Sequence, residues 1–187
     1  MLVSSFDPLA YGDAVAEILA LDGSGARLMP LAHGVCSSSQ ARTLLLTQTP
    51  RGLFPASRSP EAAMAGLWLY FSCMDESHSL SQDVHSVDGS FWHGIVHRQE
   101  PDPGNAGYWF RRAGQHAVFP LLRDEAERIV AAGGGSWRVG RDWDPFRFID
   151  ACEQARREPG SEFEKTMLEI QRAEWQLLFD HCARSAQ

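Results

Sequence analysis

The sequence contains almost no lysine, and its acidic residues outnumber its basic ones. Lys165 is the only lysine, and the formal net charge at pH 7 is −7. Because binding to nucleic-acid phosphates needs a basic face, this balance argues against a nucleic-acid partner. The adjacent Arg111 and Arg112 form too short a basic run to change that conclusion.

Long apolar runs and closely spaced cysteines are also missing. No segment approaches the roughly 18 consecutive apolar residues of a membrane-spanning helix, and the first residues lack the pattern of a signal peptide. We therefore expect a cytoplasmic protein without a membrane span. The absence of any CxxC pair predicts reduced thiols, with Cys73 buried in its apolar run, and argues against a zinc ribbon or a disulfide framework. The four cysteines are Cys36, Cys73, Cys152 and Cys182.

Motifs for nucleophilic and nucleotide chemistry are absent as well. The sequence has no GxSxG motif, and the serines at 37–39 fit a helix N-terminus better than a catalytic nucleophile. The glycine-rich stretches at 23–25 and 133–135 follow no clear strand and lack the lysine of a phosphate-binding loop. Dinucleotide and ATP chemistry are therefore not expected.

The composition that is present is that of a folded globular domain. Of 187 residues, 44% are apolar and 22% charged, and six Trp and ten Phe supply large side chains for a core. We predict one domain over residues 1–187. The Gly133–Gly135 stretch is the one candidate linker, but the 52 residues that follow it are too few for a second core.

Helix starts are the clearest local signal. Four times a capping side chain precedes a proline suited to the first helical position, and Ser161 and Glu164 form a capping box. The four pairs are Asp7-Pro8, Ser59-Pro60, Asp102-Pro103 and Asp144-Pro145. This repeated signal predicts an all-α fold of about seven or eight helices.

The expected helices can be placed along the chain. The segment 61–74 is apolar all round, so we predict that it is the central buried helix and that it continues to about His85. The pattern around Trp137 and Val139 allows a short strand. The other expected helices span residues 8–20, 38–47, 90–100, 103–113, 120–132, 145–157 and 161–183.

The segment SFWHGIVHRQEPDPGNAGYWFRRAGQH, which begins at Ser90, resembles one tetratricopeptide-type helical hairpin. The small, small, aromatic and small packing positions of that repeat are occupied by Gly94, Ala106, Phe110 and Ala113. The first-helix aromatic and leucine positions are replaced by Ser90 and His93, and the tyrosine position by His97. No second copy follows, and repeat arrays need about three copies. The resemblance therefore implies one hairpin inside another helical fold.

A longer run, from Gly66 to His116, also resembles a family of small bacterial helical proteins of uncharacterised function. The segment FWHGIVHRQEPDPGNAGYWFRR carries this resemblance. It implies no activity, so the prediction of function depends on the residues themselves.

Histidines and carboxylates concentrate in one part of the chain. Five of the seven histidines fall between His78 and His116. On a helix continuing to His85, the side chains of Asp75, His78 and His85 share one face, and His93, His97 and Glu100 share a face of the next helix. These six residues form the predicted polar pocket.

Two histidines one helical turn apart can bind one metal ion, as in HExxH helices. This chain reads HGIVH, so His93 and His97 are candidate ligands but the glutamate base is missing. A third ligand from His78, His85 or Glu76 would complete a site for zinc, iron or manganese. Two alternatives stay open. One is a metal-free site with His93, His97 and Glu100 as acid/base groups, and the other is a buried structural network.

Arginines and aromatic residues flank these histidines. Arg98, Trp109 and Arg112 are predicted to contact a small anionic ligand such as a carboxylate or a phosphate. The alternative is a surface arginine stacked on an aromatic ring, or an internal salt bridge to Glu100 or Asp102. His116 is expected to cap the end of its helix.

Two classes of function follow from these features. The first is a ligand-binding or hydrolase-like protein, with metal bound or not. The second is a non-catalytic helical scaffold or protein-interaction module. A pocket requires the two histidine faces to converge, whereas a scaffold would close them into a network or expose an apolar groove.

Overall fold

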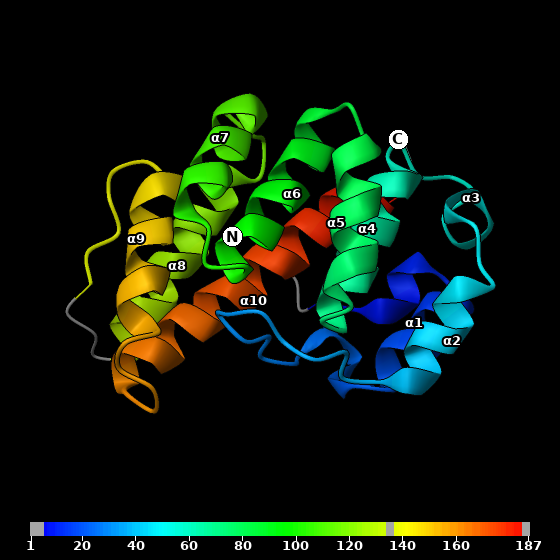
Figure 1. The fold of residues 1–187 in the computed structure, drawn as a ribbon, viewed down its shortest axis with the longest axis horizontal. Helices are drawn as coiled ribbons and strands as arrows, with labels where there is room; N and C mark the ends of the chain where they lie inside the picture. The colour runs from blue at the N-terminus through cyan, green and yellow to red at the C-terminus, as the bar shows by residue number, and fades with distance from the viewer. Residues whose placement is uncertain (1–5, 134–136, 185–187) are drawn as a thin grey trace.

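The computed structural model describes residues 6–133 and 137–184, and these residues fold into helices without a β-sheet. The predicted all-α class is confirmed. There are more helices than expected, because two predicted helices are broken and residues 50–53 form a short helix where a loop was expected. The 3-10 turns are η1 (Pro8–Tyr11) and η2 (Gly23–Gly25). The α-helices are α1 (Asp13–Ala20), α2 (Ser39–Leu46), α3 (Pro50–Leu53), α4 (Pro60–Tyr70), α5 (Met74–Asp83), α6 (Val87–Gln99), α7 (Pro103–Ala113), α8 (Phe119–Gly133), α9 (Pro145–Ala155) and α10 (Glu162–Ala183) (Figure 1).

Capping side chains start most of these helices, as predicted. Asp7, Asp102, Asp144 and Ser161 each accept a hydrogen bond from a backbone N–H in the first turn that follows. Ser59 is the exception, because its hydroxyl donates to Asp88 Oδ2 (2.6 Å) instead of capping α4. The short polar residues therefore fix where the helices begin.

Two predicted helices are interrupted where the backbone takes a positive φ. Gly12 (φ 101°) separates η1 from α1, and Ser72 (φ 55°) separates α4 from α5. The prediction of one helix continuing to His85 was therefore wrong. The Arg27 guanidinium donates to the Tyr70 carbonyl and to Ser72 Oγ (3.0 Å), so a residue distant in sequence stabilises this break.

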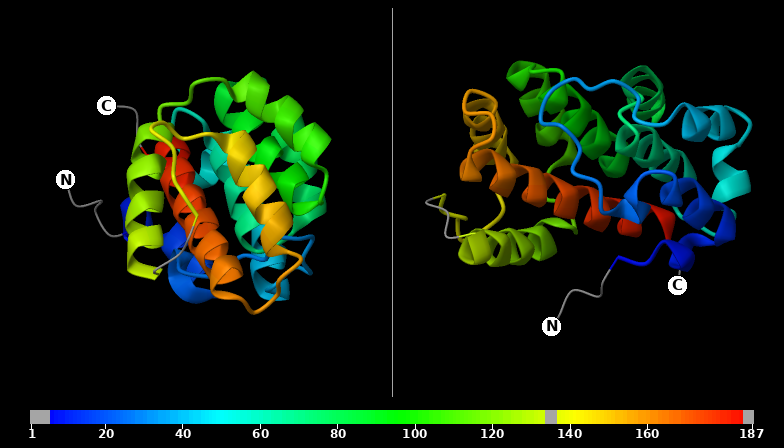
Figure 2. Two further views of the ribbon diagram at one scale, coloured as in Figure 1. Left: turned by 90° about the vertical axis from the view of Figure 1, so that its left-hand side faces the viewer. Right: turned by 90° about the horizontal axis from the view of Figure 1, so that it is seen from below.

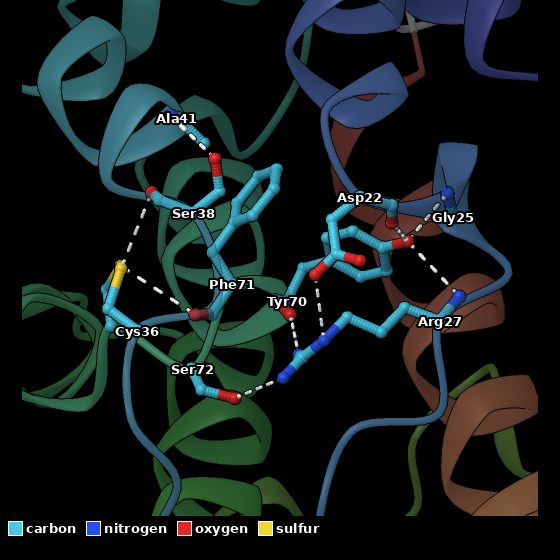
Figure 3. A network of polar contacts seen from close by, with 10 residues as sticks. Asp22, Gly25, Arg27, Cys36, Ser38, Ala41, Tyr70, Phe71 and Ser72 are labelled. Carbon is cyan, nitrogen blue, oxygen red and sulfur yellow. Dashed lines mark hydrogen bonds and ion pairs between the residues drawn. A yellow bond between two sulfur atoms is a disulfide. The ribbon is translucent and has the colours of Figure 1, made fainter.

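A network of polar contacts stabilises the backbone between α4 and α5 (Figure 3). Arg27 forms an ion pair with Asp22 (Nε to Oδ2, 2.9 Å). The Tyr70 hydroxyl accepts from Gly25 N–H (2.9 Å) and donates to the Asp22 carbonyl. The Ser37 N–H also donates to the Phe71 carbonyl (2.7 Å). Residues 22–37 therefore fix the direction in which α5 leaves α4.

The same loop is joined to α5 through a disulfide. Cys36 pairs with Cys73, the residue before α5, with their Cα atoms 4.6 Å apart. Cys73 is buried as predicted, but the prediction that it is reduced was wrong. The sequence could not show this pairing, because the fold brings together two residues 37 positions apart. Cys152 and Cys182 are free buried thiols.

The core is built around α4, as the sequence predicted. Ten of its eleven residues are buried, and Gly66 lets the Trp92 ring come within 2.6 Å of where a Cβ would lie. The long helix α10 runs along much of the molecule (Figure 2). Trp175 on this helix donates from Nε1 to the Gly66 carbonyl (2.8 Å). Buried apolar side chains from Tyr11 to Ala183 form one cluster.

Helices α6 and α7 pack against each other as a hairpin. A Cβ on Gly94 would lie 3.0 Å from the Phe110 ring, so the absence of a side chain permits this close approach of the two helices. The strand allowed around Trp137 and Val139 is wrong, because residues 137–144 form a loop. Residues 134–135 of the candidate linker lie outside the described residues. None of the described helices has the length and apolar character needed to cross a membrane.

Candidate metal centre

Three histidine rings from α5 and α6 meet at one point. His93 and His97 stand one turn apart on α6, and His78 approaches from α5. The ring centroids are 4.5 Å (His78–His93), 5.1 Å (His78–His97) and 4.7 Å (His93–His97) apart. One ring nitrogen from each lies within 4.8 Å of the other two. The structure thus brings together the predicted pair and one of its three candidate third ligands.

The nitrogens of His93 and His97 that face away from this point each have a polar neighbour. Nδ1 of His93 lies 2.8 Å from Ser81 Oγ. A Glu100 oxygen lies 2.8 Å from Nδ1 of His97, within ion-pair distance but without the alignment of a hydrogen bond. Outer partners of this kind orient metal-bound histidines and fix their tautomer.

One arrangement of protons suits both these outer partners and a metal ion. As an acceptor, the Glu100 carboxylate favours the Nδ1–H tautomer of His97. The Ser81 hydroxyl also lies 3.2 Å from the His78 carbonyl, and when it donates there it accepts from Nδ1–H of His93. Both Nε2 atoms, which lie 3.1 Å apart, then present lone pairs to each other. A cation between them would relieve that repulsion.

The same atoms also allow a metal-free arrangement. In this arrangement the Ser81 hydroxyl donates to Nδ1 of His93. The Nε2–H of His93 then donates to Nε2 of His97, and the Nδ1–H of His97 points toward Glu100. Every group in this chain is neutral except the carboxylate. The two arrangements differ in the tautomer of His93 and in the rotation of one hydroxyl.

Burial favours the neutral form of the His93 and His97 imidazoles. It lowers the pKa of His93 to about 3, with the neighbouring His78 and His97 acting in the same direction. Burial also lowers the pKa of His97, against the opposing effect of Glu100. An additional proton, which would turn one ring into a charged imidazolium, is therefore disfavoured between the two Nε2 atoms at neutral pH, and neutral imidazole is the form that binds metals.

The spacing is close to that of a coordinated ion. Two nitrogens bound to one tetrahedral zinc at 2.0–2.1 Å lie roughly 3.3 Å apart. The Nε2 atoms of His93 and His97 already meet this distance at 3.1 Å. A ring nitrogen of His78 lies within 4.8 Å of both, so a third imidazole is close enough to take part in the same site.

Aromatic and basic residues of α7 border the histidines. The Trp109 ring packs on His93 with centroids 4.3 Å apart. The Arg112 guanidinium lies 5.2 Å from the Trp109 centroid, and its side chain is exposed. Trp109 and Arg112, which the sequence predicted to contact a ligand, therefore lie beside the histidine cluster. Trp109 is the nearer of the two.

Three other predicted site residues lie away from the cluster. Asp75 is exposed on a different face of α5, and His85 is exposed in the loop after α5. Arg98 is 1% exposed and pairs through both terminal nitrogens with Glu174 of α10, while its guanidinium covers the Phe148 ring at 4.5 Å. The salt bridge considered from the sequence exists, but its partner is Glu174 and not Glu100 or Asp102. The continuous-helix assumption misplaced Asp75 and His85, because α5 is a separate helix.

The sequence interpretation missed a second cluster and the role of Ser81. Asp88 Oδ1 accepts from His116 Nε2 (2.9 Å) and lies 3.3 Å from His181 Nε2. His116 was expected to end a helix, but its Nδ1 instead accepts from Val118 N–H (3.2 Å) ahead of α8. Ser81 follows His78 by three residues on one helix, and this spacing could have predicted that the two side chains lie on the same side of α5.

The second cluster is a hydrogen-bonded network around the Asp88 carboxylate, and its geometry is less suited to a metal ion. Both nitrogens of His116 are engaged, so it has no lone pair for an ion. Burial opposes the charge on Asp88, but hydrogen bonds from His116, His181 and Ser59 outweigh it and hold the pKa of this carboxyl well below its usual range. In contrast to the three-histidine cluster, this one satisfies its own charges.

Comparison with protein-family models, curated proteins and solved structures found no match. The resemblances to a tetratricopeptide hairpin and to a bacterial family stay predictions. The argument for function therefore depends on the geometry of the site.

Proposed function

We propose that this protein binds one divalent transition-metal ion through His78, His93 and His97. The observation that carries the proposal is the pair of Nε2 atoms 3.1 Å apart, each on a ring whose other nitrogen contacts an outer polar group. His78 adds a third imidazole within reach of both. Ser81 and Glu100 are the positioning residues.

The donor set favours zinc among the ions expected from the sequence. Neutral imidazoles suit zinc, copper, nickel and iron, whereas manganese and magnesium prefer oxygen ligands. Three protein ligands leave the fourth tetrahedral position open, as in catalytic zinc sites. An ion bound there would lower the pKa of a coordinated water, which is the basis for the hydrolase-like activity that we propose. Trp109 and Arg112 would border a small anionic substrate.

The proposed cellular location is the cytoplasm, as expected from the sequence. The Cys36–Cys73 disulfide is a feature more typical of an oxidising compartment. A cytoplasmic protein would have to keep this disulfide against a reducing thiol pool.

The proposal is tested by the metal content of the untagged protein and by its calorimetric titration with zinc after chelation. We expect one zinc per chain in the wild type and loss of binding in His93→Ala/His97→Ala. The matched control is His33→Ala/His85→Ala, which removes two exposed histidines outside the cluster and should bind zinc like the wild type.

Two results would contradict the proposal. A wild type that binds no zinc after chelation would mean that the histidines form the metal-free chain of hydrogen bonds. Equal loss of zinc in both double variants would mean that the ion binds to surface histidines.

A further inference from the structure

A groove runs along the side of α5 that carries Asp75 and Asp83. Its volume is about 540 Å³, and it lies between α5 and the α2–α3 segment, with α4 beneath. The apolar lining consists of Leu45, Met64 and Trp68, which are buried, with Leu46 61% exposed at the mouth. The groove therefore offers apolar contact to a partner from solvent.

The α5 rim of the groove is acidic. Asp75, Ser79 and Asp83 are exposed and lie at intervals of four residues, so they stand along one side of the helix. The two aspartates are about 12 Å apart along the axis, at 1.5 Å per residue. Glu76 is already paired with Arg42 (2.6 Å). Within the described part of the chain, Asp75 and Asp83 have no ion-pair partner.

We propose that this groove binds a basic amphipathic helix of a partner protein. Apolar side chains of such a helix would cover Leu46 and the lining beneath it. Lysines or arginines two turns apart would pair with Asp75 and Asp83. An apolar groove that receives one face of a helix is a recurring mode of recognition, and complementary charges at its rim select the partner and speed association.

The charge of the groove favours a basic helix over an acidic or neutral one. The chain carries a net charge of −7, and the two unpaired carboxylates face solvent at the groove. An acidic or neutral helix would leave both carboxylates without compensation. The groove is separate from the histidine cluster, because His78 and Ser81 are directed from α5 toward α6. This inference therefore stands independently of metal binding.

Fluorescence anisotropy with a labelled synthetic helix tests the inference on the full-length protein. The probe is a Leu/Lys/Ala peptide roughly 18 residues long, with leucines on one face and lysines two turns apart. The comparison peptide has glutamates in place of the lysines. We expect the lysine peptide to bind and the glutamate peptide not to bind.

Variants distinguish the groove from general attraction by net charge. Asp75→Asn/Asp83→Asn should weaken binding about tenfold, whereas Asp142→Asn/Asp150→Asn, which removes equal charge from exposed positions near α9, should change it less than about twofold. Leu46→Gln should also weaken binding. No binding by the wild type, or equal losses in both double aspartate variants, would overturn the inference.

Discussion

At the residue scale, the candidate centre depends on two side chains that would not touch the ion. Ser81 contacts Nδ1 of His93 and a Glu100 oxygen lies 2.8 Å from Nδ1 of His97, so both are placed to orient the rings in the proposed site. Losing such an outer partner commonly lowers metal affinity by about 10–100-fold. The strength of zinc binding is therefore expected to depend on Glu100 even though it is not a ligand.

Glu100→Gln should weaken zinc binding by about tenfold or more, because a neutral amide holds the His97 ring less strongly than a carboxylate does. Calorimetric titration of the chelated protein measures this. Glu127→Gln, on the exposed side of α8, is the matched control and should leave the affinity unchanged. Unaltered affinity in Glu100→Gln would remove Glu100 from the site.

Another prediction at this scale concerns the buried pair of Arg98 and Glu174. Both side chains are fully enclosed, and Gln171 also contacts the guanidinium (3.4 Å). Glu174→Gln leaves a buried charge uncompensated and should lower the free energy of unfolding by about 3–5 kcal/mol. Urea denaturation checks this against Glu162→Gln, an exposed change on the same helix that should cost less than about 0.5 kcal/mol.

At the element scale, local signals in the sequence predicted helix starts well and helix connections poorly. The helix α7 runs from Pro103 to Ala113 as expected, because its cap and proline are local. The break after α4 escaped prediction because its cause, Arg27, lies more than 40 residues earlier. The HGIVH spacing was enough to pair His93 with His97, whereas finding Ser81 required the actual packing of α5 on α6.

The disulfide gives a prediction for this break. Replacing both partners, Cys36→Ser/Cys73→Ser, opens a loop of 37 residues and should lower the free energy of unfolding by about 3–4 kcal/mol. Thermal or urea unfolding with and without a phosphine reductant measures this. The wild type should shift toward the variant on reduction, and the variant should not respond. A wild type indifferent to reductant would contradict the disulfide.

At the scale of the whole molecule, the Asp88 network joins distant parts of the chain. Asp88 lies in the first turn of α6, His116 precedes α8 and His181 lies near the end of α10. A hydrogen bond from His181 to Asp88 raises the pKa of His181, although its partial burial and Arg58 oppose the shift and Asp180 supports it. The network should therefore be strongest when His181 is protonated.

This gives a pH dependence with a defined sign. Because the folded pKa of His181 is raised, its contribution is fully present below its unfolded pKa, near 6.5, and is lost as the pH rises through the folded value. The depressed pKa of Asp88 keeps that carboxylate charged throughout this range. Wild type and His181→Gln should therefore differ most in unfolding free energy below the unfolded pKa of about 6.5, and the difference should shrink as the pH rises above it. A difference that grows with pH would contradict this assignment.

The most direct test of the metal centre is the long-range ¹H–¹⁵N spectrum of the histidine side chains, recorded before and after one equivalent of zinc. We predict that His78, His93 and His97 shift together, and that His93 and His97 become Nδ1–H tautomers bound through Nε2. His33 and His85 should stay unchanged. Zinc that moves none of the three clustered histidines, or moves only the exposed ones, would contradict the proposed site.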